Sequence, residues 1–278
     1  MKIHLKQRIK NIIPNSFKSA VKKLLSGKPK FGWFGNYASW KDANDQCTGY
    51  DSDVILNKVK EAVLKVKNGE AVYERDSVLF DVIDYSQPLL DAFISIAKNS
   101  NNELHVIDFG GSLGSSYFQN RSFLQNLNKL QWSIVEQKHF VDCGKAAIEE
   151  EQLKFYYTIE EALTKDKAKV LFVSSVIQYF ERPYELIEQF LSYNFEYIII
   201  DRTAFIESSV ERITVQIVPD SIYRASYPAW FFNEPKFKAA FSGKYDLLNE
   251  FDSKFDPRER LEDQVLSYRK GFLFKRKQ

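Results

Sequence analysis

The chain has 278 residues, of which 44% are hydrophobic and 27% are charged, the composition of a folded protein with a sizeable core. No apolar run reaches the roughly 18 residues of a membrane-spanning helix, and lysines interrupt the apolar runs at the N-terminus. The sequence therefore predicts neither a transmembrane segment nor a secretory signal. Cys47 and Cys143 lie far apart without metal-ligand spacing, which predicts two free thiols in a reducing cytoplasm.

The net charge of +2 conceals an uneven distribution along the chain. Residues 1–30 hold nine Lys/Arg and no Asp/Glu, so the other 248 residues hold 30 basic and 37 acidic side chains, a net charge of −7. A mildly acidic body argues against nucleic acid as a partner. The pattern divides the chain into a basic amphipathic arm (1–30), an aromatic-rich helical lead-in or lid (31–100) and a strand–helix body (101–278).

In the arm, apolar residues recur at the spacing of one helical face, and lysines fall on the other side. The apolar positions are Phe17, Ala20, Val21, Leu24 and Leu25, and the basic ones are Lys18, Lys22 and Lys23. A helix of this kind can bind an anionic membrane surface. Packing on the acidic body, binding of another partner and disorder are alternatives that the sequence leaves open.

The lead-in begins with "FGWFGNYASWKDA", which is unusually dense in aromatic residues. Helical periodicity then predicts a helix over 52–67, ended by Asn68-Gly69, and a second helix over 87–98 with Pro88 in its first turn. Between them lies the polar cluster "YERD", Tyr73 to Asp76, which either folds over a ligand or caps a helix.

The body alternates between strand and helix patterns. Strands are expected over 104–109, 132–136, 153–157, 169–175 and 197–201, and Pro183 opens the helix after the fourth of them. After residue 210, "RITVQIV", "YDLLNEF" and "RKGFLFK" read as strands, with a helix near 234–241 and an antiparallel pairing of the last two strands. The alternation favours a doubly wound, mostly parallel α/β sheet.

The segment "VIDFGGSLGSSYF" carries the main functional signal. It places Asp108 at the end of the first body strand, followed by Gly110, Gly111 and Gly114, where a bound ligand can approach the backbone. The pattern D-x-G-G-x-x-G is not the dinucleotide motif G-x-G-x-x-G, and a carboxylate there suits the ammonium end of S-adenosylmethionine rather than a pyrophosphate. Glu136 ends the second strand, 28 residues beyond Asp108, where it can accept both ribose hydroxyls.

Several segments resemble a family of methyltransferases associated with bacterial surface-polysaccharide gene clusters. They are "VIDFGGSLGSSYFQNR", "WSIVEQKHFVDCGK", "LFVSSVIQYFERPYELI", "YIIIDRTAF", "WFGNYASWKDA" and "VYERDSVLFD", so the resemblance covers roughly residues 31–235. It implies a class I methyltransferase-like Rossmann fold, with a mostly parallel seven-stranded sheet and an antiparallel C-terminal strand. It also implies S-adenosylmethionine as the cofactor, but no acceptor and no catalytic residues.

Candidate site residues follow from their places at strand ends. We assign Asp108, the three glycines and Glu136 to the cofactor, with Gln137 near the adenine. Ser174 and Ser175, which close the fourth strand, are expected near the methyl-bearing end.

Asp201 and Arg202 at the end of the fifth strand, and Tyr179 in the turn after the fourth, are the candidate catalytic residues. A plain salt bridge and a packing role are their respective alternatives. His4, His105 and His139 are placed less well for a general base.

An aromatic acceptor groove is predicted from two segments far apart in the chain, although an aromatic core is the alternative. Its candidate residues are Trp33, Tyr37, Tyr223, Arg224 and Trp230.

The predicted function is O-methylation of a sugar hydroxyl on a surface glycan or its lipid-linked precursor. The enzyme would be cytoplasmic, and peripheral at the inner face of the membrane through its arm. A non-catalytic scaffold of a polysaccharide assembly complex is one alternative, and an NAD or nucleotide-sugar enzyme is another. The sequence identifies neither the sugar nor the oligomeric state, and no compact Asp/Glu/His constellation suggests a metal.

Overall fold

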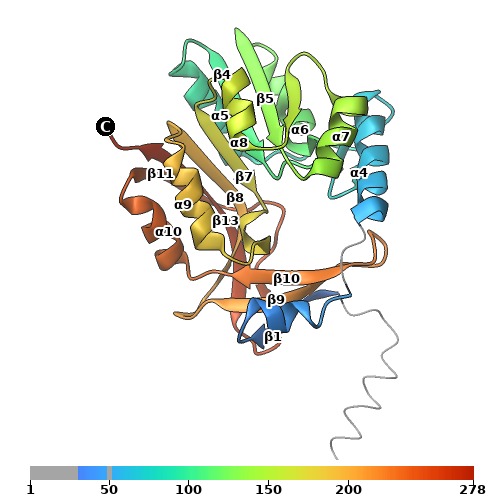
Figure 1. The fold of residues 1–278 in the computed structure, drawn as a ribbon, viewed down its shortest axis with the longest axis vertical. Coiled ribbons are helices and arrows are strands. Elements are labelled where there is room, and N and C mark those ends of the chain that lie inside the picture. Colours follow the sequence, from blue (N-terminus) through green and yellow to red (C-terminus); the bar gives the residue numbers. More distant parts are fainter. Residues whose placement is uncertain (1–30, 49–51) are drawn as a thin grey trace, which may run out of the picture. The chain divides into compact units, whose positions relative to one another are not determined.

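A computed structural model of the protein describes residues 31–48 and 52–278, so the predicted arm lies outside the described residues. Its main sheet has the strand order β11-β13-β8-β7-β4-β5-β6 (Figure 1). These strands are β4 (Glu103–Phe109), β5 (Lys129–Val135), β6 (Leu153–Tyr156), β7 (Val170–Ser174), β8 (Tyr197–Ile206), β11 (Tyr245–Asp252) and β13 (Leu266–Arg276), and β12 (Glu259–Arg260) pairs with β13 beside this path.

Strand direction completes the fold assignment. Strands β4 to β8 pair in parallel, whereas β13 is antiparallel to both β8 and β11. Numbered by appearance in the chain, the seven strands follow the order 3-2-1-4-5-7-6, with the seventh reversed. This is the class I methyltransferase-like Rossmann fold, and the predicted fold class and the antiparallel C-terminal pair are confirmed.

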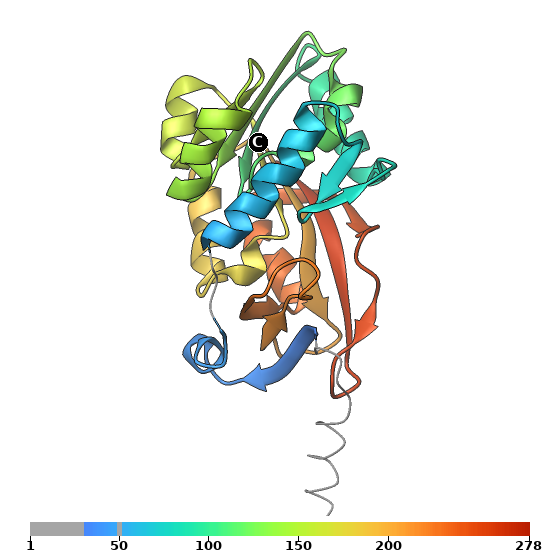
Figure 2. The same cartoon turned by 90° about the vertical axis from the view of Figure 1, so that its right-hand side faces the viewer.

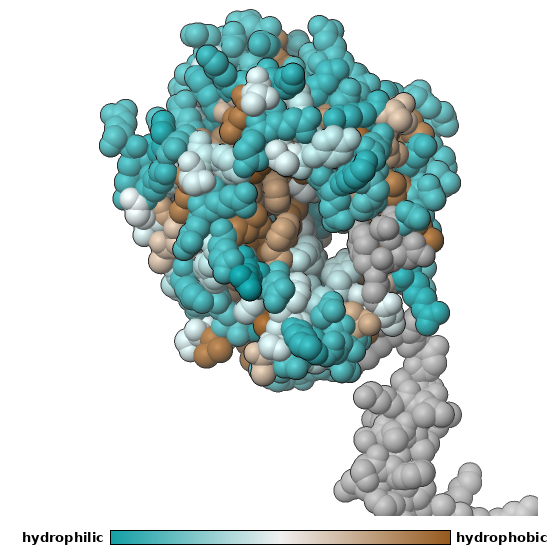
Figure 3. Space-filling model, viewed as in Figure 1, coloured by the Kyte–Doolittle hydropathy of each residue, from teal (hydrophilic) through white to brown (hydrophobic). Residues whose placement is uncertain are grey.

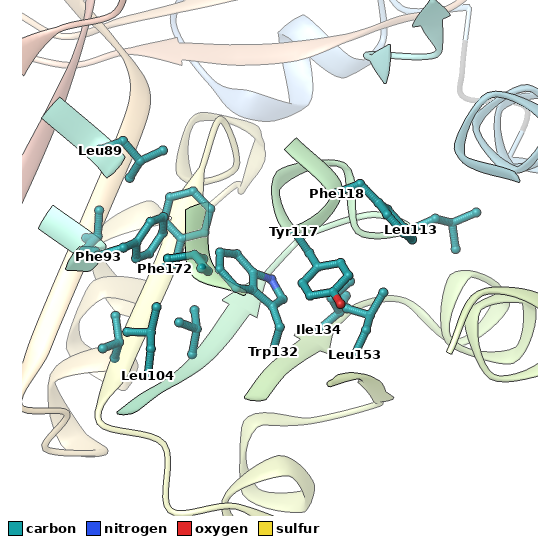
Figure 4. Packing of buried hydrophobic residues seen from close by; sticks show 14 of the residues in the cluster. Leu89, Phe93, Leu104, Leu113, Tyr117, Phe118, Trp132, Ile134, Leu153 and Phe172 are labelled. Carbon is teal, nitrogen blue, oxygen red and sulfur yellow. The ribbon is translucent and has the colours of Figure 1, made fainter. Parts of the chain in front are cut away.

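The helices divide between the two faces of the main sheet and form two hydrophobic cores. On one face lie α4 (Ser52–Lys67), α5 (Gln87–Lys98), α6 (Ser115–Leu124) and α7 (Lys138–Cys143), with the π-helical turn η2 (Gly144–Ile148). On the other face lie α8 (Ile159–Lys165), α9 (Pro183–Ser192) and α10 (Glu234–Ser242). Figure 4 shows the first core, in which Phe93 and Phe172 meet the ring of Trp132 edge-on.

A second, three-stranded sheet lies at the carboxyl ends of the parallel strands. Its order is β1-β9-β10, from β1 (Gly32–Tyr37), β9 (Arg212–Ile217) and β10 (Ser226–Phe231). The sheet joins the end of β8 through Phe232, whose N–H donates to Ala204 O and whose carbonyl accepts from Ile206 N–H. In Figure 1 this small sheet lies below the main sheet, near the lower ends of β8 and β13.

The sequence predicted α4 and α5 at their observed bounds and the first four parallel strands to within three residues. The fifth strand, β8, was predicted to end at residue 201 but continues to Ile206. It did not predict β1, β10 or the hairpin of β2 (Tyr73–Arg75) and β3 (Val78–Phe80), and it described the lead-in as helical. In β1, Gly32 and Gly35 adopt positive φ and the register shifts, so the alternation that marks a strand is lost. In β10, Pro228 is tolerated because the strand is at a sheet edge.

Two smaller predictions can also be compared with the described residues. Cys47 and Cys143 are free thiols, as predicted. Among residues 31–48 and 52–278, no helix combines the length and the hydrophobicity needed to span a bilayer.

Candidate functional site

The glycine turn connects the end of β4 to the start of α6, and it is shaped by its protein neighbours. The Gly110 N–H donates to Val135 O over 2.9 Å, which ties the turn to the end of β5. Gly110 has φ +73°, and a Cβ there would lie 2.5 Å from Val176 Cγ2. Gly114, at φ +98°, is the N-cap of α6. Glycine is therefore required at both positions by backbone conformation, and at Gly110 by packing as well.

Asp108 lies beneath this turn and is sealed from solvent, with 1% of its surface exposed. The indole N–H of Trp132 donates to its Oδ2 over 2.9 Å. A Cβ on Gly111 would lie 2.5 Å from the carboxyl carbon of Asp108, so this glycine leaves room for the carboxyl group. Burial raises the pKa of Asp108 to about 7, the Trp132 hydrogen bond opposes that rise, and the charge of Glu136 adds to it.

Glu136 follows the last residue of β5 and lies beside the same turn. Its Oε2 accepts the N–H of Gln137 over 2.6 Å. Burial raises the pKa of the Glu136 carboxyl, while the backbone N–H groups of Gln137 and Ser112 act in the opposite direction. Gln137 itself is exposed at the N-cap of α7.

A third carboxyl group reaches the turn from the hairpin β2–β3, which packs against α6. Glu74 is 2% exposed, and burial raises its pKa to about 7 even though the neighbouring Ser115 side chain lowers it. The sequence marked this residue only as part of a polar cluster. Carboxyl groups from three separate elements thus surround residues 110–115, and within the described part of the chain none of them forms a salt bridge.

A second cluster of polar residues lies where β7 ends beside the middle of β8, which continues to Ile206 rather than ending at Asp201 as the sequence predicted. Ser174 Oγ donates to Asp201 Oδ2 over 3.0 Å, and Ser175 N–H donates to the Asp201 carbonyl over 3.0 Å. Asp201 is 3% exposed, and burial raises its pKa to about 6 although Arg202 lowers it. Ser175 and Arg202 have φ of +56° and +50°, a strained backbone that is commonest at functional sites.

Arg202 turns its guanidinium group toward other carboxylates. Its Nε donates to Asp256 Oδ2 over 2.9 Å, and its terminal nitrogen donates to Asp76 Oδ2 over 3.3 Å. Asp76 is at the tip of the hairpin, so Arg202 links that tip to the middle of β8. The predicted Asp201–Arg202 pair is adjacent in the chain, but its two side chains have separate hydrogen-bond partners.

Tyr179 lies in the turn η3 (Ile177–Tyr179) and faces the second sheet. Its hydroxyl donates to Gln216 Oε1 over 2.8 Å, and its ring meets Tyr227 edge-on at 5.2 Å. Burial raises the pKa of Tyr179 to about 12, so it is a neutral phenol at pH 7. It can donate and accept hydrogen bonds, but it is not an anionic base at that pH.

The predicted acceptor residues lie on two faces of the three-stranded sheet. Trp33, Gln216 and Tyr227 are cross-strand partners on the face toward Tyr179, where Arg269 lies 4.2 Å over the Trp33 ring. The other face carries Tyr37 and Trp230, which pack with Ile213 and the short helix α3 (Trp40–Asn44).

Two predicted acceptor residues belong to the loop before β10. Tyr223 is half-buried, with its side chain close to Tyr227, whereas Arg224 is exposed.

The surface is hollowed between the carboxyl ends of the parallel strands and the three-stranded sheet, and apolar residues show inside the hollow (Figure 3). The two polar groups described above belong to this edge of the main sheet. His105 lies away from this edge, within β4. Its Nδ1 is 2.5 Å from Oδ1 of Asp166, the C-cap of α8, so the contact joins two structural elements. In the part of the chain that is described, no group of His, Cys, Asp or Glu side chains is arranged to hold a metal ion.

Neither a protein-family model nor a curated protein matches this sequence. Solved structures are similar in fold. One is the N-terminal domain of EvdMO1 in the presence of SAH and D-fucose, which is 13% identical, covers 82% of this chain and 98% of its own, and gives a TM-score of 0.47. An S-adenosylmethionine-dependent methyltransferase from Clostridium acetobutylicum is 12% identical, covers 79% of this chain and 98% of its own, and gives 0.44.

A third similar structure is the 1,6-didemethyltoxoflavin-N1-methyltransferase of Burkholderia thailandensis, crystallised with S-adenosylhomocysteine. It is 10% identical, covers 88% of this chain and 93% of its own, and gives a TM-score of 0.42. At such identities and TM-scores the likeness concerns the fold alone.

Proposed function

We propose that this protein is an S-adenosylmethionine-dependent methyltransferase. The observation that carries the proposal is a pair of carboxyl groups, the buried Asp108 and the partly buried Glu136, beside the glycine turn at the edge where doubly wound sheets bind ligands. A buried carboxylate without a cation is costly. A ligand that brings both positive charge and ribose hydroxyls offsets that cost, whereas the pyrophosphate of NAD would add negative charge beside the two carboxyl groups.

The same edge suits transfer to a hydroxyl group. When bound, S-adenosylmethionine would supply its methyl group to an acceptor oxygen, which attacks the methyl carbon in line with the carbon–sulfur bond, and that bond would break to leave S-adenosylhomocysteine. Asp201, with its pKa raised to about 6, is mostly ionised at pH 7 and can take the hydroxyl proton as the carbon–oxygen bond forms. Ser174 holds one oxygen of this carboxyl group in place.

For the acceptor we propose a sugar of a surface glycan or its lipid-linked precursor. The sequence resemblance to methyltransferases of polysaccharide gene clusters supports this choice. Tyr227, on the face toward Tyr179, supports it too, since sugar C–H groups rest on aromatic rings, and the Tyr179–Gln216 pair offers polar contacts beside it. Trp33 is covered by Arg269 and packs against Phe231, so it is not part of this surface.

Isothermal titration of the folded protein with S-adenosylmethionine, S-adenosylhomocysteine and NAD tests the cofactor. We expect both adenosyl ligands to bind and NAD not to bind. Failure of a folded sample to bind either adenosyl ligand would overturn the proposal. Release of S-adenosylhomocysteine in the presence of glycan or lipid-linked sugar extracts tests catalysis, and binding without turnover would favour the scaffold alternative.

We also propose that the basic arm, residues 1–30, brings a cytoplasmic enzyme to the inner membrane surface. The support is its nine Lys/Arg without any Asp/Glu. Full-length protein should float with anionic liposomes, and a variant that lacks residues 1–30 should not. Equal flotation of the two proteins would remove the anchoring role.

A further inference from the structure

The hairpin β2–β3 carries a carboxyl group whose charge the protein itself does not use. Glu74 Oε2 accepts the N–H of Ser77 over 3.3 Å, across a two-residue turn in which Asp76 and Ser77 have positive φ. Oε1 is buried and accepts no hydrogen bond from the described residues, although the nearby Ser115 side chain lowers the pKa of the carboxyl group. A neutral amide oxygen would accept the Ser77 N–H equally well, so the turn does not need a charged side chain.

The hairpin is held in place by other contacts. Arg75 lies 4.3 Å over the ring of Phe255, and Asp76 at the tip pairs with Arg202. Neither Arg75 nor Arg202 forms an ion pair with Glu74 in the described part of the chain, although the charge of Arg75 lowers the pKa of Glu74. Figure 2 shows the hairpin in cyan beside α4. The position of Glu74 does not depend on an ion pair of its own.

The location of Glu74 connects it to the glycine turn. Its carboxyl group is next to Ser115, the first residue of α6, and Gly114 immediately precedes it as the N-cap. Asp108 and Glu136 approach the same turn from β4 and from the end of β5. The side of the turn that the hairpin covers therefore presents one more acceptor with an unused oxygen.

We propose that Glu74 binds the ammonium group at the amino-acid end of the cofactor. This assignment rests on the proposed function, because it presumes a sulfonium nucleoside in the site. Oε1 of Glu74 has no hydrogen-bond donor, and the buried carboxylate has no counter-ion. A primary ammonium group supplies both, because it carries three N–H donors and a positive charge. Burial raises the pKa of Glu74 to about 7, so a bound cation would also hold the carboxyl group in its ionised form.

The test is a titration of wild type and Glu74→Gln with three ligands. S-adenosylmethionine and S-adenosylhomocysteine have the ammonium group, and 5′-methylthioadenosine lacks the whole amino-acid end. We expect Glu74→Gln to weaken the first two by at least about tenfold, the usual loss for a charge-assisted hydrogen bond, and to change the third by less than about twofold. The matched control is Glu70→Gln, an exposed residue of the same segment, which should change none of the three.

Equal weakening of all three ligands would show that Glu74 only supports the fold, and unchanged affinities would also overturn the assignment. Both outcomes leave the cofactor proposal intact, because wild type binds S-adenosylmethionine and S-adenosylhomocysteine in both. A folded wild type that binds none of the ligands would overturn the two together. If Glu74→Gln does not fold, Glu74→Asp keeps the charge on a shorter side chain, and it should weaken S-adenosylhomocysteine but not 5′-methylthioadenosine. Equal affinity of this variant and wild type for S-adenosylhomocysteine would contradict the proposal.

Discussion

Replacing Asp108 with asparagine should stabilise the free protein at neutral pH. The folded protein holds the Asp108 proton up to a pKa of about 7, whereas the unfolded chain releases it near the ordinary value of 3.8. Between these values the folded state binds more protons, so this residue lowers the free energy of unfolding as the pH rises. At about 1.4 kcal/mol for each factor of ten, the loss between pH 4 and pH 8 amounts to at most about 4 kcal/mol.

Asparagine has nearly the same shape and keeps an oxygen that can accept the Trp132 N–H, but it cannot ionise. Urea unfolding at pH 4, 5, 6, 7 and 8 measures the difference, with exposed Asp220→Asn as the control. We expect wild type and Asp108→Asn to be similar at pH 4, and the variant to become progressively more stable toward pH 8. If the difference in the free energy of unfolding between the two proteins stays constant within about 0.5 kcal/mol over this range, the pKa of Asp108 is not raised by burial and the reasoning is refuted.

The same variant should bind S-adenosylmethionine less tightly, because the ligand cation then lacks its partner. Saturating S-adenosylmethionine should therefore stabilise wild type more than Asp108→Asn at pH 8. A variant that is more stable without ligand but binds the ligand more weakly identifies a residue that serves function and destabilises the fold.

Three further substitutions test the rest of the site. Glu136→Gln should weaken S-adenosylmethionine binding about tenfold by calorimetry, since an amide is a poorer acceptor for two ribose hydroxyls; an unchanged affinity would remove Glu136 from the cofactor site. Gly110→Ala should lower the free energy of unfolding by about 2 kcal/mol or more in urea. The loss should clearly exceed that of Gly69→Ala, because Gly69 has a similar φ but nothing within 4 Å of an added Cβ. Equal losses would exclude the clash with Val176. Asp201→Asn should lower kcat by about 10²–10⁴ and leave S-adenosylmethionine affinity unchanged, and the rise of wild-type activity with pH near 6 should disappear; a fully active variant would rule out Asp201 as the base.

Part of the candidate site could be predicted because the strands of a parallel sheet end at one edge. Asp108 lies in the last two residues of a recognisable buried strand, and the glycines and Glu136 follow such strands, so strand order alone brings them to one edge. The partners of these residues could not be predicted in this way. Trp132 lies within β5 and pairs with Asp108 only because neighbouring strands place the two side chains on the same face.

Glu74 and Asp256 show the same limit more strongly. Glu74 reaches the turn through a hairpin with only three residues in each strand, too short for a clear alternation of polar and apolar residues. Asp256 meets Arg202 across 54 residues of sequence. Nothing in the local sequence around either carboxylate indicates its partner.

Local patterns in this sequence determined the helices α4 and α5, the five parallel strands and the glycine turn, because periodicity and backbone preference act over a few residues. Tertiary structure alone decided that β1, from the lead-in, pairs with β9 about 180 residues later, and that the aromatic residues fall on two faces of that small sheet. It also decided which carboxyl groups are buried without a cation. Burial and pairing are properties of neighbours that are distant in the chain, and those neighbours exist only once the chain has folded.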